Sequence, residues 1–177
     1  MSSDVILATT ISTPIGPLSL LARGDALVGG GFTADPGWLH ARLRPALRAL
    51  PLAPGELPWA AKPASDYFDG DLSALDLLPV DQRSGPARER LWAELRRVPP
   101  GSPVSYAELA RRAGSPRAIR AAGGACASNL VAPVVPCHRV VRTDGSLGGY
   151  LYGLGKKQWL LRHESAASSP DPIAAPA

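Results

Sequence analysis

The stretch Val135-Pro136-Cys137-His138-Arg139-Val140-Val141 places a thiol, an imidazole and a guanidinium side by side, in a setting that resembles a buried strand. Ionisable groups are costly in apolar surroundings unless they have partners or a chemical task. A cysteine next to a histidine is most often a buried thiol beside a surface residue, because free cysteine is among the most buried residue types. Other features of the chain are needed to tell whether this stretch is a plain core segment or a reactive site.

The length and composition are those of a globular protein. The 177 residues suffice for one compact domain or two small ones, and 45% are hydrophobic against 19% charged. Two cysteines, Cys126 and Cys137, without any Cys-x-x-Cys spacing, and three scattered histidines predict neither a disulfide framework nor a metal site. The first residues lack the basic segment of a signal peptide, and no apolar run approaches membrane-spanning length. We therefore expect a cytoplasmic location and no membrane partner.

Charge is distributed unevenly along the chain. Residues 1–80 carry five Lys and Arg against eight Asp and Glu, a net charge of −3. Residues 81–164 carry fourteen against six, a net charge of +8. A basic half-chain is typical of proteins that bind a polyanion, although a solvated basic surface without a partner has the same composition.

The first half of the chain favours short strands followed by helix. Apolar runs at residues 5–11, 18–22 and 26–32 are separated by turn residues, a pattern typical of an antiparallel meander. A helical stretch is expected around residues 38–50, and the proline-rich residues 51–63 are expected to interrupt regular structure. Residues 1–80 therefore predict a small α/β domain.

From Ser84 onwards the pattern is mainly helical. A helix is expected after Ser84-Gly85-Pro86, and Ser105-Tyr106-Ala107-Glu108 is a capping box that opens a second helix. Gly114 ends that helix, and Ser115-Pro116 is expected to cap a third over residues 117–127. Two short helices joined by a glycine-containing turn have the form of a helix-turn-helix, although such hairpins also occur in plain cores.

The third helix is unusual because it contains two internal glycines, Gly123 and Gly124. Each costs about 1 kcal/mol relative to alanine, so close approach to another backbone is expected. The helix either packs tightly inside the protein or lies against a narrow groove, with Arg120 as its large side chain. Residues 131–135 are expected to form a strand, and residues 165–177, rich in Ala, Ser and Pro, are expected to be disordered.

A cysteine nucleophile requires a base or a positive field that favours its thiolate. His138 is the nearest candidate, but neighbouring side chains of an extended segment point to opposite faces, so a bridging water or a turn would be needed. Glu164 is a candidate to orient the imidazole. A papain-like hydrolase is disfavoured, because there the cysteine opens a long helix and the histidine lies far downstream. A helix-turn-helix regulator would explain the basic half but not the thiol.

Pro136-Cys137-His138-Arg139-Val140-Val141, with Asn129 eight residues before the cysteine, resembles the active-site signature of the O6-alkylguanine-DNA alkyltransferases. The likeness extends over residues 101–164 and, more weakly, to residues 13–18. It implies an α/β fold: a small ribonuclease H-like domain over residues 1–80, then a mainly helical, winged-helix-like domain with a helix-turn-helix over residues 81–164. Residues 165–177 would follow as the disordered tail.

The resemblance also implies roles for individual residues. Cys137 would accept the alkyl group from O6 of guanine, with His138 as its base through a water. Glu164 would hold His138, and Asn129 would brace the turn that presents the cysteine. Substrate-binding residues would be Tyr106, Val140, Tyr150 and Leu151, and DNA-binding residues would be Ser105, Arg120, Ala121 and Gly123.

The product of such a reaction is a thioether, so each molecule would act once. The implied partner is double-stranded DNA that contains O6-alkylguanine, bound by a monomer without cofactor or metal. A protein that binds or senses alkylated DNA without repairing it is the alternative, which retention of Cys137 disfavours. Tyr152 stands where many family members have a small residue, and would either narrow the alkyl pocket or cover its rim.

Overall fold

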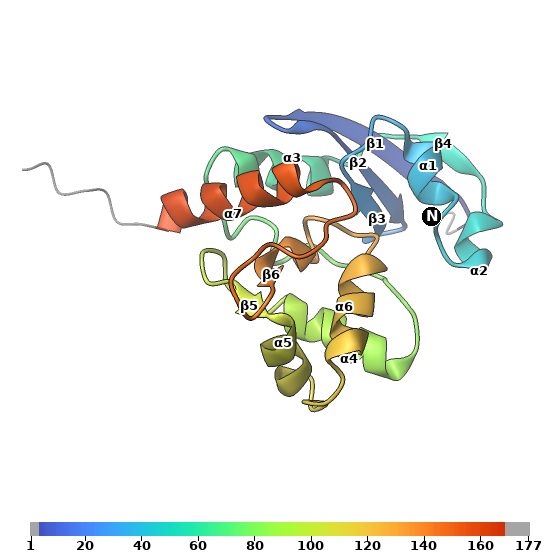
Figure 1. Ribbon diagram of the computed structural model, residues 1–177. Helices are drawn as coiled ribbons and strands as arrows, with labels where there is room; N and C mark the ends of the chain where they lie inside the picture. The colour runs from blue at the N-terminus through green and yellow to red at the C-terminus, as the bar shows by residue number, and fades with distance from the viewer. Residues whose placement is uncertain (1–3, 169–177) are drawn as a thin grey trace, which may run out of the picture.

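A four-stranded sheet forms from the first half of the chain in the computed structural model, which describes residues 4–168 (Figure 1). Its strands are β1 (Ile6–Thr13), β2 (Gly16–Arg23), β3 (Ala26–Gly31) and β4 (Leu52–Pro54), in the order β3-β2-β1-β4. The first three are antiparallel, and β4 pairs with β1 in parallel. The three predicted strands of the meander are confirmed. Gly24 has a φ of +61° in the β2–β3 turn, a conformation that glycine adopts freely.

Three helices accompany the sheet: α1 (Pro36–His40), α2 (Pro45–Arg48) and α3 (Pro58–Phe68). The helical stretch predicted around residues 38–50 is confirmed in part: it is divided into α1 and α2, because Arg44 is extended, as is usual for the residue before a proline, and Pro45 begins a new helix. The prediction that residues 51–63 lack regular structure is wrong. This segment contains β4, and Pro58 occupies the first helical position of α3, where proline is favoured.

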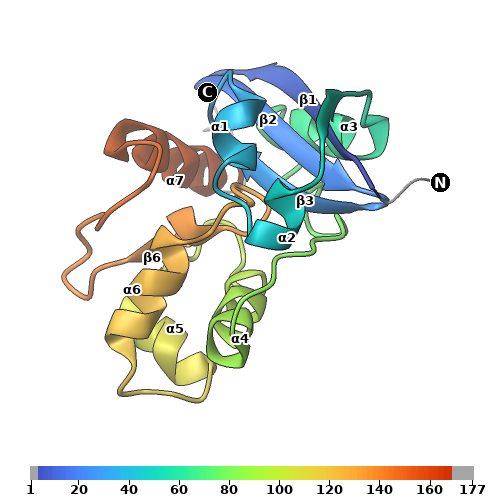
Figure 2. The same cartoon turned by 90° about the vertical axis from the view of Figure 1, so that its right-hand side faces the viewer.

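The second half of the chain is mainly helical, as predicted. Its elements are α4 (Pro86–Leu95), β5 (Val104–Ser105), α5 (Tyr106–Arg112), α6 (Ile119–Ala127), β6 (Val140–Val141) and α7 (Leu154–Ser168). Figure 2 shows α4, α5 and α6 grouped below the sheet. The Ser105 hydroxyl caps α5 by accepting from the Glu108 N–H at 3.0 Å. The predicted cap of the next helix at Ser115-Pro116 is wrong, because residues 115–118 form a turn closed by the Ala118 N–H on the Ser115 carbonyl.

The segment before the cysteine is a turn rather than the predicted strand over residues 131–135. Val131 makes one isolated bridge to Gly30, and its carbonyl then accepts from the Val135 N–H at 2.8 Å. Pro133 and Pro136 have no N–H for a strand ladder, so a continuous strand cannot form here. Cys137–Arg139 form a single 3-10 turn, η1, which leads into β6.

Helix α7 closes the fold by packing on α3. The Tyr67 and His163 rings contact at 5.3 Å, and the Phe68 and Trp159 rings at 5.9 Å. One hydrophobic core runs through both halves of the chain, from Leu18 to Leu160. The domain boundary that the sequence predicts at residue 80 therefore stays a prediction.

The expected disorder of residues 165–177 is wrong for residues 165–168, because α7 continues through them. The remainder of that segment lies outside the described residues. Among the described residues, no helix has the length and apolar character needed to cross a membrane.

Candidate active site

The backbone turn at Cys137 is held by Asn129. Its Nδ2 donates to the Val135 carbonyl at 2.7 Å and to the Cys137 Sγ at 3.2 Å. Its Oδ1 accepts from the Val131 N–H at 3.1 Å. Asn129 and Cys137 are only 2% and 7% exposed, so this amide fixes both the loop and the thiol in a buried setting.

Gln82 supports Asn129 from the segment before α4. Its Nε2 donates to the Asn129 Oδ1 at 3.1 Å, and its Oε1 accepts from the Leu130 N–H at 2.8 Å. Sequence reasoning missed this residue. Nothing in the neighbouring sequence distinguishes a glutamine that binds another segment from one that points into solvent.

His138 is fully buried and contacts Glu164 on α7. The His138 Nε2 lies 2.7 Å from the Glu164 Oε1, and both side chains have no exposed surface. A carboxylate can only accept, so Nε2 carries the proton of this hydrogen bond. Among residues 4–168, nothing hydrogen-bonds to the Nδ1 atom of His138. The unshared electron pair of the neutral ring therefore lies on Nδ1.

Arg139 and Tyr67 complete the surroundings of Glu164. The guanidinium of Arg139 contacts both carboxylate oxygens at 2.8–3.1 Å, and the Tyr67 hydroxyl donates to Oε1 at 2.7 Å. Arg139 also donates to the Val98 carbonyl at 2.7 Å. Sequence reasoning assigned roles to neither Arg139 nor Tyr67, although Arg139 is part of the signature run.

These contacts set the protonation states of the pair. Burial alone would raise the pKa of Glu164, but its bonds to His138 and the charge of Arg139 outweigh burial and lower it. Burial lowers the pKa of His138, and Glu164 offsets this only partly. At neutral pH we therefore assign an ionised Glu164, balanced by Arg139, beside a neutral His138.

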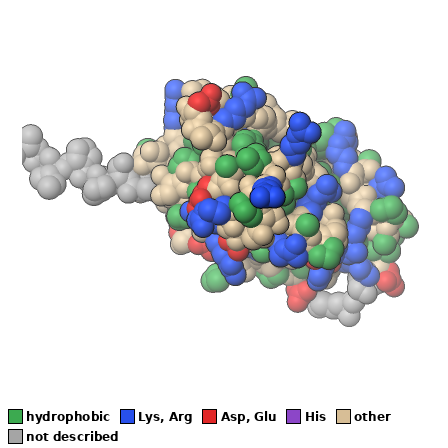
Figure 3. All heavy atoms as spheres, turned by 60° about the horizontal axis from the view of Figure 1, so that its bottom comes forward, with side chains coloured by type: hydrophobic (Ala, Val, Ile, Leu, Met, Phe, Trp, Pro, Cys, Tyr) green, Lys and Arg blue, Asp and Glu red, His purple; other side chains and the backbone are tan. Residues whose placement is uncertain are grey.

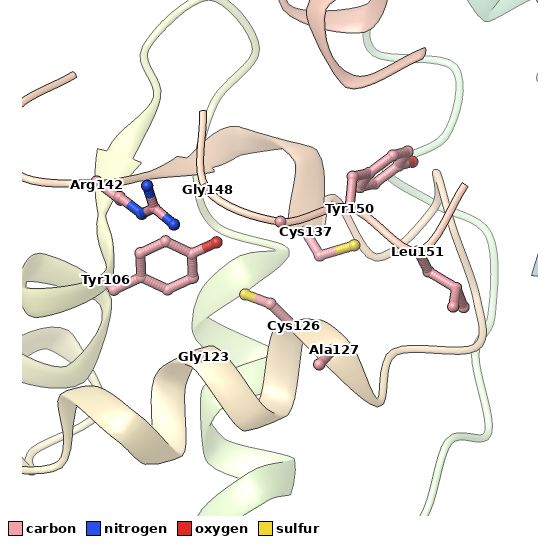
Figure 4. Close-up of a pocket in the computed structure, with 10 residues that line it drawn as sticks. Tyr106, Gly123, Cys126, Ala127, Cys137, Arg142, Gly148, Tyr150 and Leu151 are labelled. Carbon is pink, nitrogen blue, oxygen red and sulfur yellow. The ribbon is translucent and has the colours of Figure 1, made fainter. Parts of the chain in front are cut away.

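A cavity of about 490 Å³ opens in front of Cys137 (Figure 4). The thiols of Cys137 and Cys126 and the hydroxyl of Tyr106 converge on it. Tyr150 and Leu151 form the side opposite Tyr106. The lining residues are Tyr106, Gly123, Cys126, Ala127, Cys137, Arg142, Gly148, Gly149, Tyr150 and Leu151. The cavity is thus mostly apolar with a few converging polar groups, as is typical of small-molecule sites.

The thiols of Cys126 and Cys137 and the hydroxyl of Tyr106, which face the cavity, keep their protons at physiological pH. Burial raises the pKa of Cys137, while the hydrogen bond from Asn129 and the charge of Lys157 oppose it. Burial raises the pKa of Cys126 to about 12 and also raises that of Tyr106. The Cys137 thiol therefore needs a base when it reacts, and Tyr106 retains its proton and can donate.

Lys157, which sequence reasoning missed, binds the loop between β6 and α7 on one side of the cavity. Its ammonium donates to the Val140 carbonyl at 2.7 Å, to the Gly149 carbonyl at 3.1 Å and to the Leu147 carbonyl. The residue has no exposed surface. A buried lysine bound to three carbonyls links the loop that follows β6 to the strand next to the cysteine.

The α5–α6 hairpin presents a basic surface beside the cavity. Arg120 and Ala121 are exposed on α6, and Gly123 of the same helix lines the cavity. Figure 3 shows Lys and Arg side chains spread over the face that carries α4–α6. The exposed arginines of these helices and their connections are Arg88, Arg90, Arg97, Arg111, Arg112, Arg117 and Arg120.

The structure thus brings together most of the residues singled out in the sequence. Asn129 donates to Cys137, His138 contacts Glu164, and the two pairs are joined by the peptide bond between Cys137 and His138. Tyr106, Tyr150 and Leu151 line the cavity. Val140 is fully buried and is not a lining residue. The Ser105 hydroxyl is engaged as the cap of α5. Among residues 4–168, no three His, Cys, Asp or Glu side chains gather as a metal site.

Known proteins are similar to this chain in sequence and in fold. The family profile described as 6-O-methylguanine DNA methyltransferase, DNA binding domain, matches residues 86–166. The methylated-DNA–protein-cysteine methyltransferase of Shigella flexneri is 36% identical over 166 residues, which are 90% of this chain and 95% of that protein. The corresponding protein of Mycobacterium tuberculosis is 35% identical over 162 residues, 92% of this chain and 94% of its own. This chain belongs to the methylated-DNA–protein-cysteine methyltransferase family.

Solved structures agree with this membership. The crystal structure of Mycobacterium tuberculosis O6-methylguanine methyltransferase superposes with a TM-score of 0.76 at 32% identity and covers 94% of this chain and 96% of that one. The same organism's protein in complex with DNA gives a TM-score of 0.75 at 32% identity, covering 92% and 94%. The mixed α/β fold, with a small sheet and a helical region, is therefore that of the methyltransferase family.

Proposed function

We propose that this protein repairs DNA by moving the alkyl group of O6-alkylguanine onto Cys137, once per molecule. The observation that carries the proposal is that Cys137, held by Asn129 and followed by the buried pair of His138 and Glu164, lines a cavity beside a basic helix hairpin. Family membership supports the same activity. Both lines of support favour an alkyl acceptor over a protein that senses alkylated DNA without repairing it.

The reaction follows from the protonation states of the site. The Cys137 proton passes through a water to Nδ1 of His138, whose Nε2 is already committed to Glu164. The thiolate attacks the alkyl carbon in line, so that an S–C bond forms as the C–O6 bond breaks. The bonding electrons remain on guanine, where the Tyr106 hydroxyl donates a hydrogen bond to the developing charge. The proton lost by Cys137 balances the one that guanine finally takes up.

The proposed substrate is double-stranded DNA, bound by a monomer. Helix α6 would lie in the minor groove, where Ala121 and Gly123 allow close approach and Ser105 contacts the backbone. Arg120 would occupy the space of the flipped nucleotide, since base-flipping proteins commonly insert a side chain into the stack. In the cavity, Tyr150 and Leu151 would wall the alkyl group. Val140 does not line the cavity, so it would act only by supporting the backbone that follows Cys137.

We also propose two finer fold assignments. A three-stranded meander with β4 returning parallel to β1 supports a ribonuclease H-like first half. The α5–α6 hairpin beside the short β5–β6 pair supports a winged-helix-like second half. We infer a cytoplasmic location, where a reducing environment keeps Cys137 as a thiol.

The first test is the stoichiometry of transfer. After incubation with a duplex containing isotopically labelled O6-methylguanine, intact-mass analysis should show one added methyl group, and peptide mapping should place it on Cys137. Cys137→Ser should acquire none, whereas Cys126→Ser should behave like the wild type. Turnover beyond one methyl group per protein, or bound duplex beside an unmodified Cys137, would contradict the proposal.

A second test concerns Arg120. Arg120→Ala should slow repair of a duplex by about tenfold or more, because holding a base out of the stack costs a few kcal/mol. Reaction with free O6-methylguanine should change little. Arg162→Ala is the matched control, since it removes the same charge from an exposed position of α7, away from α6 (Figure 1). An equal loss on both substrates would count against a role in the stack.

A further inference from the structure

A chain of hydrogen bonds reaches the Cys137 thiol from Gln82, a half-buried residue between α3 and α4. The Oε1 of Gln82 accepts from the Leu130 N–H at 2.8 Å, and its Nε2 donates to the Asn129 Oδ1 at 3.1 Å. The Nδ2 of Asn129 in turn donates to the Cys137 Sγ at 3.2 Å. Gln82 does not line the cavity, so this chain joins a residue outside the cavity to the sulfur inside it.

Two backbone N–H groups fix the direction of every bond in this chain. An amide side chain has a donor end and an acceptor end of nearly the same shape, so its orientation follows from its partners. The Leu130 N–H can only donate, which turns the Gln82 oxygen towards it and leaves the Gln82 amino group facing Asn129. The Val131 N–H likewise donates to the Asn129 Oδ1 at 3.1 Å. Both amides therefore have one favourable orientation, in which the amino end of Asn129 faces the sulfur.

This orientation favours the thiolate form of Cys137. An N–H donor stabilises the sulfur anion more than it stabilises the neutral thiol. Burial raises the pKa of Cys137, and the hydrogen bond from Asn129 is the largest effect that opposes burial. Gln82 strengthens that bond, because a hydrogen bond accepted at the amide oxygen polarises the amide and makes its N–H groups better donors. With the oxygen end of Asn129 towards the sulfur, the same contact would oppose the thiolate.

Other titratable groups face the thiol from the elements packed around it. The charge of Lys157 on α7 also lowers the pKa of Cys137, and His138, the next residue, is fully buried. The remaining groups are Tyr106 of α5, Cys126 of α6, and Arg142, Tyr150 and Tyr152 of the loop between β6 and α7. Within residues 4–168, the Gln82 side chain is hydrogen-bonded to none of these groups. A substitution of Gln82 therefore leaves them in place.

We propose that Gln82 is a positioning residue for the reaction of Cys137: it holds Asn129 with its amino end towards the sulfur and so stabilises the thiolate as it forms. Gln82 acts through Asn129, since it has no hydrogen bond to the sulfur and does not line the cavity. The consequence is faster alkyl transfer at neutral pH, where the buried thiol must lose its proton before it attacks. That consequence for DNA rests on the proposed function, whereas the effect on the thiol does not.

The test is the pH dependence of Cys137 alkylation by iodoacetamide. The thiol proton passes to solvent, and the thiolate displaces iodide, so that the S–C bond forms as the C–I bond breaks. Peptide mapping separates Cys137 from Cys126. Gln82→Glu keeps the shape of glutamine, but its carboxylate only accepts and sets a negative oxygen against the Asn129 Oδ1. Its rate at neutral pH should fall by about tenfold and approach the wild-type rate in alkaline solution, where both proteins are thiolates.

Gln82→Leu tests the same contact without adding a charge. It removes both hydrogen bonds of the amide, so the rate at neutral pH should fall by about threefold to fivefold and again recover in alkaline solution. Ser84→Glu is the matched control, because Ser84 and Gln82 line the same second cavity of about 230 Å³. This variant places the same charge in that cavity without a hydrogen bond to Asn129, and its pH profile should equal that of the wild type.

Several outcomes overturn the proposal. A Gln82→Leu profile equal to that of the wild type shows that the amide does not act on the thiol. A loss that is the same at every pH shows that Gln82 only supports the fold, and equal losses in Gln82→Glu and Ser84→Glu show an effect of charge alone. Thermal unfolding verifies that each variant is folded. Gln82→Glu keeps the acceptor of the Leu130 N–H, so its comparison with Ser84→Glu decides the question if Gln82→Leu does not fold.

Failure of the proposed function gives a different result. Methyl transfer from a duplex that contains O6-methylguanine should follow the order wild type, Gln82→Leu, Gln82→Glu at neutral pH. A wild-type protein that transfers no methyl group disproves repair activity. The iodoacetamide profiles need no DNA, so they decide the role of Gln82 in either case.

Discussion

Glu164→Gln should lower the free energy of unfolding by about 3–5 kcal/mol, because it leaves the charge of Arg139 buried without its partner. Arg139 is 4% exposed, and without Glu164 it would keep its hydrogen bond to the Val98 carbonyl. Glutamine has nearly the shape of glutamate and can still accept from His138, so the loss reports charge rather than packing. Urea denaturation measured by circular dichroism gives the free energy, provided that the slope with denaturant is unchanged.

A matched control is the pair of Glu94 and Arg97, whose side chains lie 2.6 Å apart, because the Arg97 side chain is 74% exposed and stays solvated when its partner is removed. Glu94→Gln should cost no more than about 1 kcal/mol, since exposed ion pairs contribute little. Adding Arg139→Met to Glu164→Gln should recover part of the loss by removing the stranded charge. If Glu164→Gln and Glu94→Gln lower the free energy of unfolding by the same amount, the buried pairing of Glu164 with Arg139 does not stabilise the protein as we infer.

The pH dependence of stability has a defined sign. The pKa of His138 in the folded protein lies below its ordinary value of 6.5, so the unfolded chain takes up that proton first as the pH falls. The pKa of Glu164 lies below its ordinary value of 4.5, with the same consequence at lower pH. Stability from both groups is therefore present above pH 6.5 and is lost on acidification, and Glu164→Gln should abolish the contribution below pH 4.5.

His138→Gln should slow alkyl transfer by about 10²–10⁴-fold at neutral pH, the usual contribution of a general base. A glutamine amide can still donate to Glu164 but cannot take the Cys137 proton. The deficit should shrink as the pH rises, because burial raises the pKa of Cys137 and thiolate then forms without a base only in alkaline solution. Single-turnover rates on a methylated duplex across the pH range measure both effects.

His163→Gln is the control for this experiment. His163 lies on α7, and its ring stacks on that of Trp159 at 4.8 Å. Its Nε2 is 2.8 Å from the Tyr67 carbonyl. It is not a lining residue of the cavity, so its replacement should leave the transfer rate nearly unchanged. A His138→Gln deficit that stays constant with pH would show that His138 does not act as the base.

The chemistry of the site could be anticipated because it is concentrated in a short segment. Cys137, His138 and Arg139 are adjacent in the chain, and their cost in an apolar run is itself the signal. The capping box at Ser105 and the glycine turn at Gly114 likewise report local backbone geometry, which the structure shows. Local patterns were misleading where prolines intervened, as in residues 131–135, because apolar content alone does not reveal a missing N–H.

The partners of the site could not be anticipated from local patterns. Tyr67 donates to Glu164 across 97 positions of sequence, and Gln82 donates to Asn129 across 47. Neither periodicity nor spacing records a contact of that kind. The roles of the individual site residues in transfer stay predictions until the variants above are measured.

The sequence by itself determined the family, the three-strand meander and the mainly helical second half, and it singled out Cys137 as the candidate acceptor, because each of these depends on neighbouring residues or on a motif. Only the tertiary structure decided which nitrogen of His138 is free, what balances the charge of Glu164 and where Tyr152 is seated. Those properties depend on burial and on contacts between distant segments. The Tyr152 side chain is the clearest case, since it lies against Gly31, where a Cβ would overlap the Tyr152 hydroxyl.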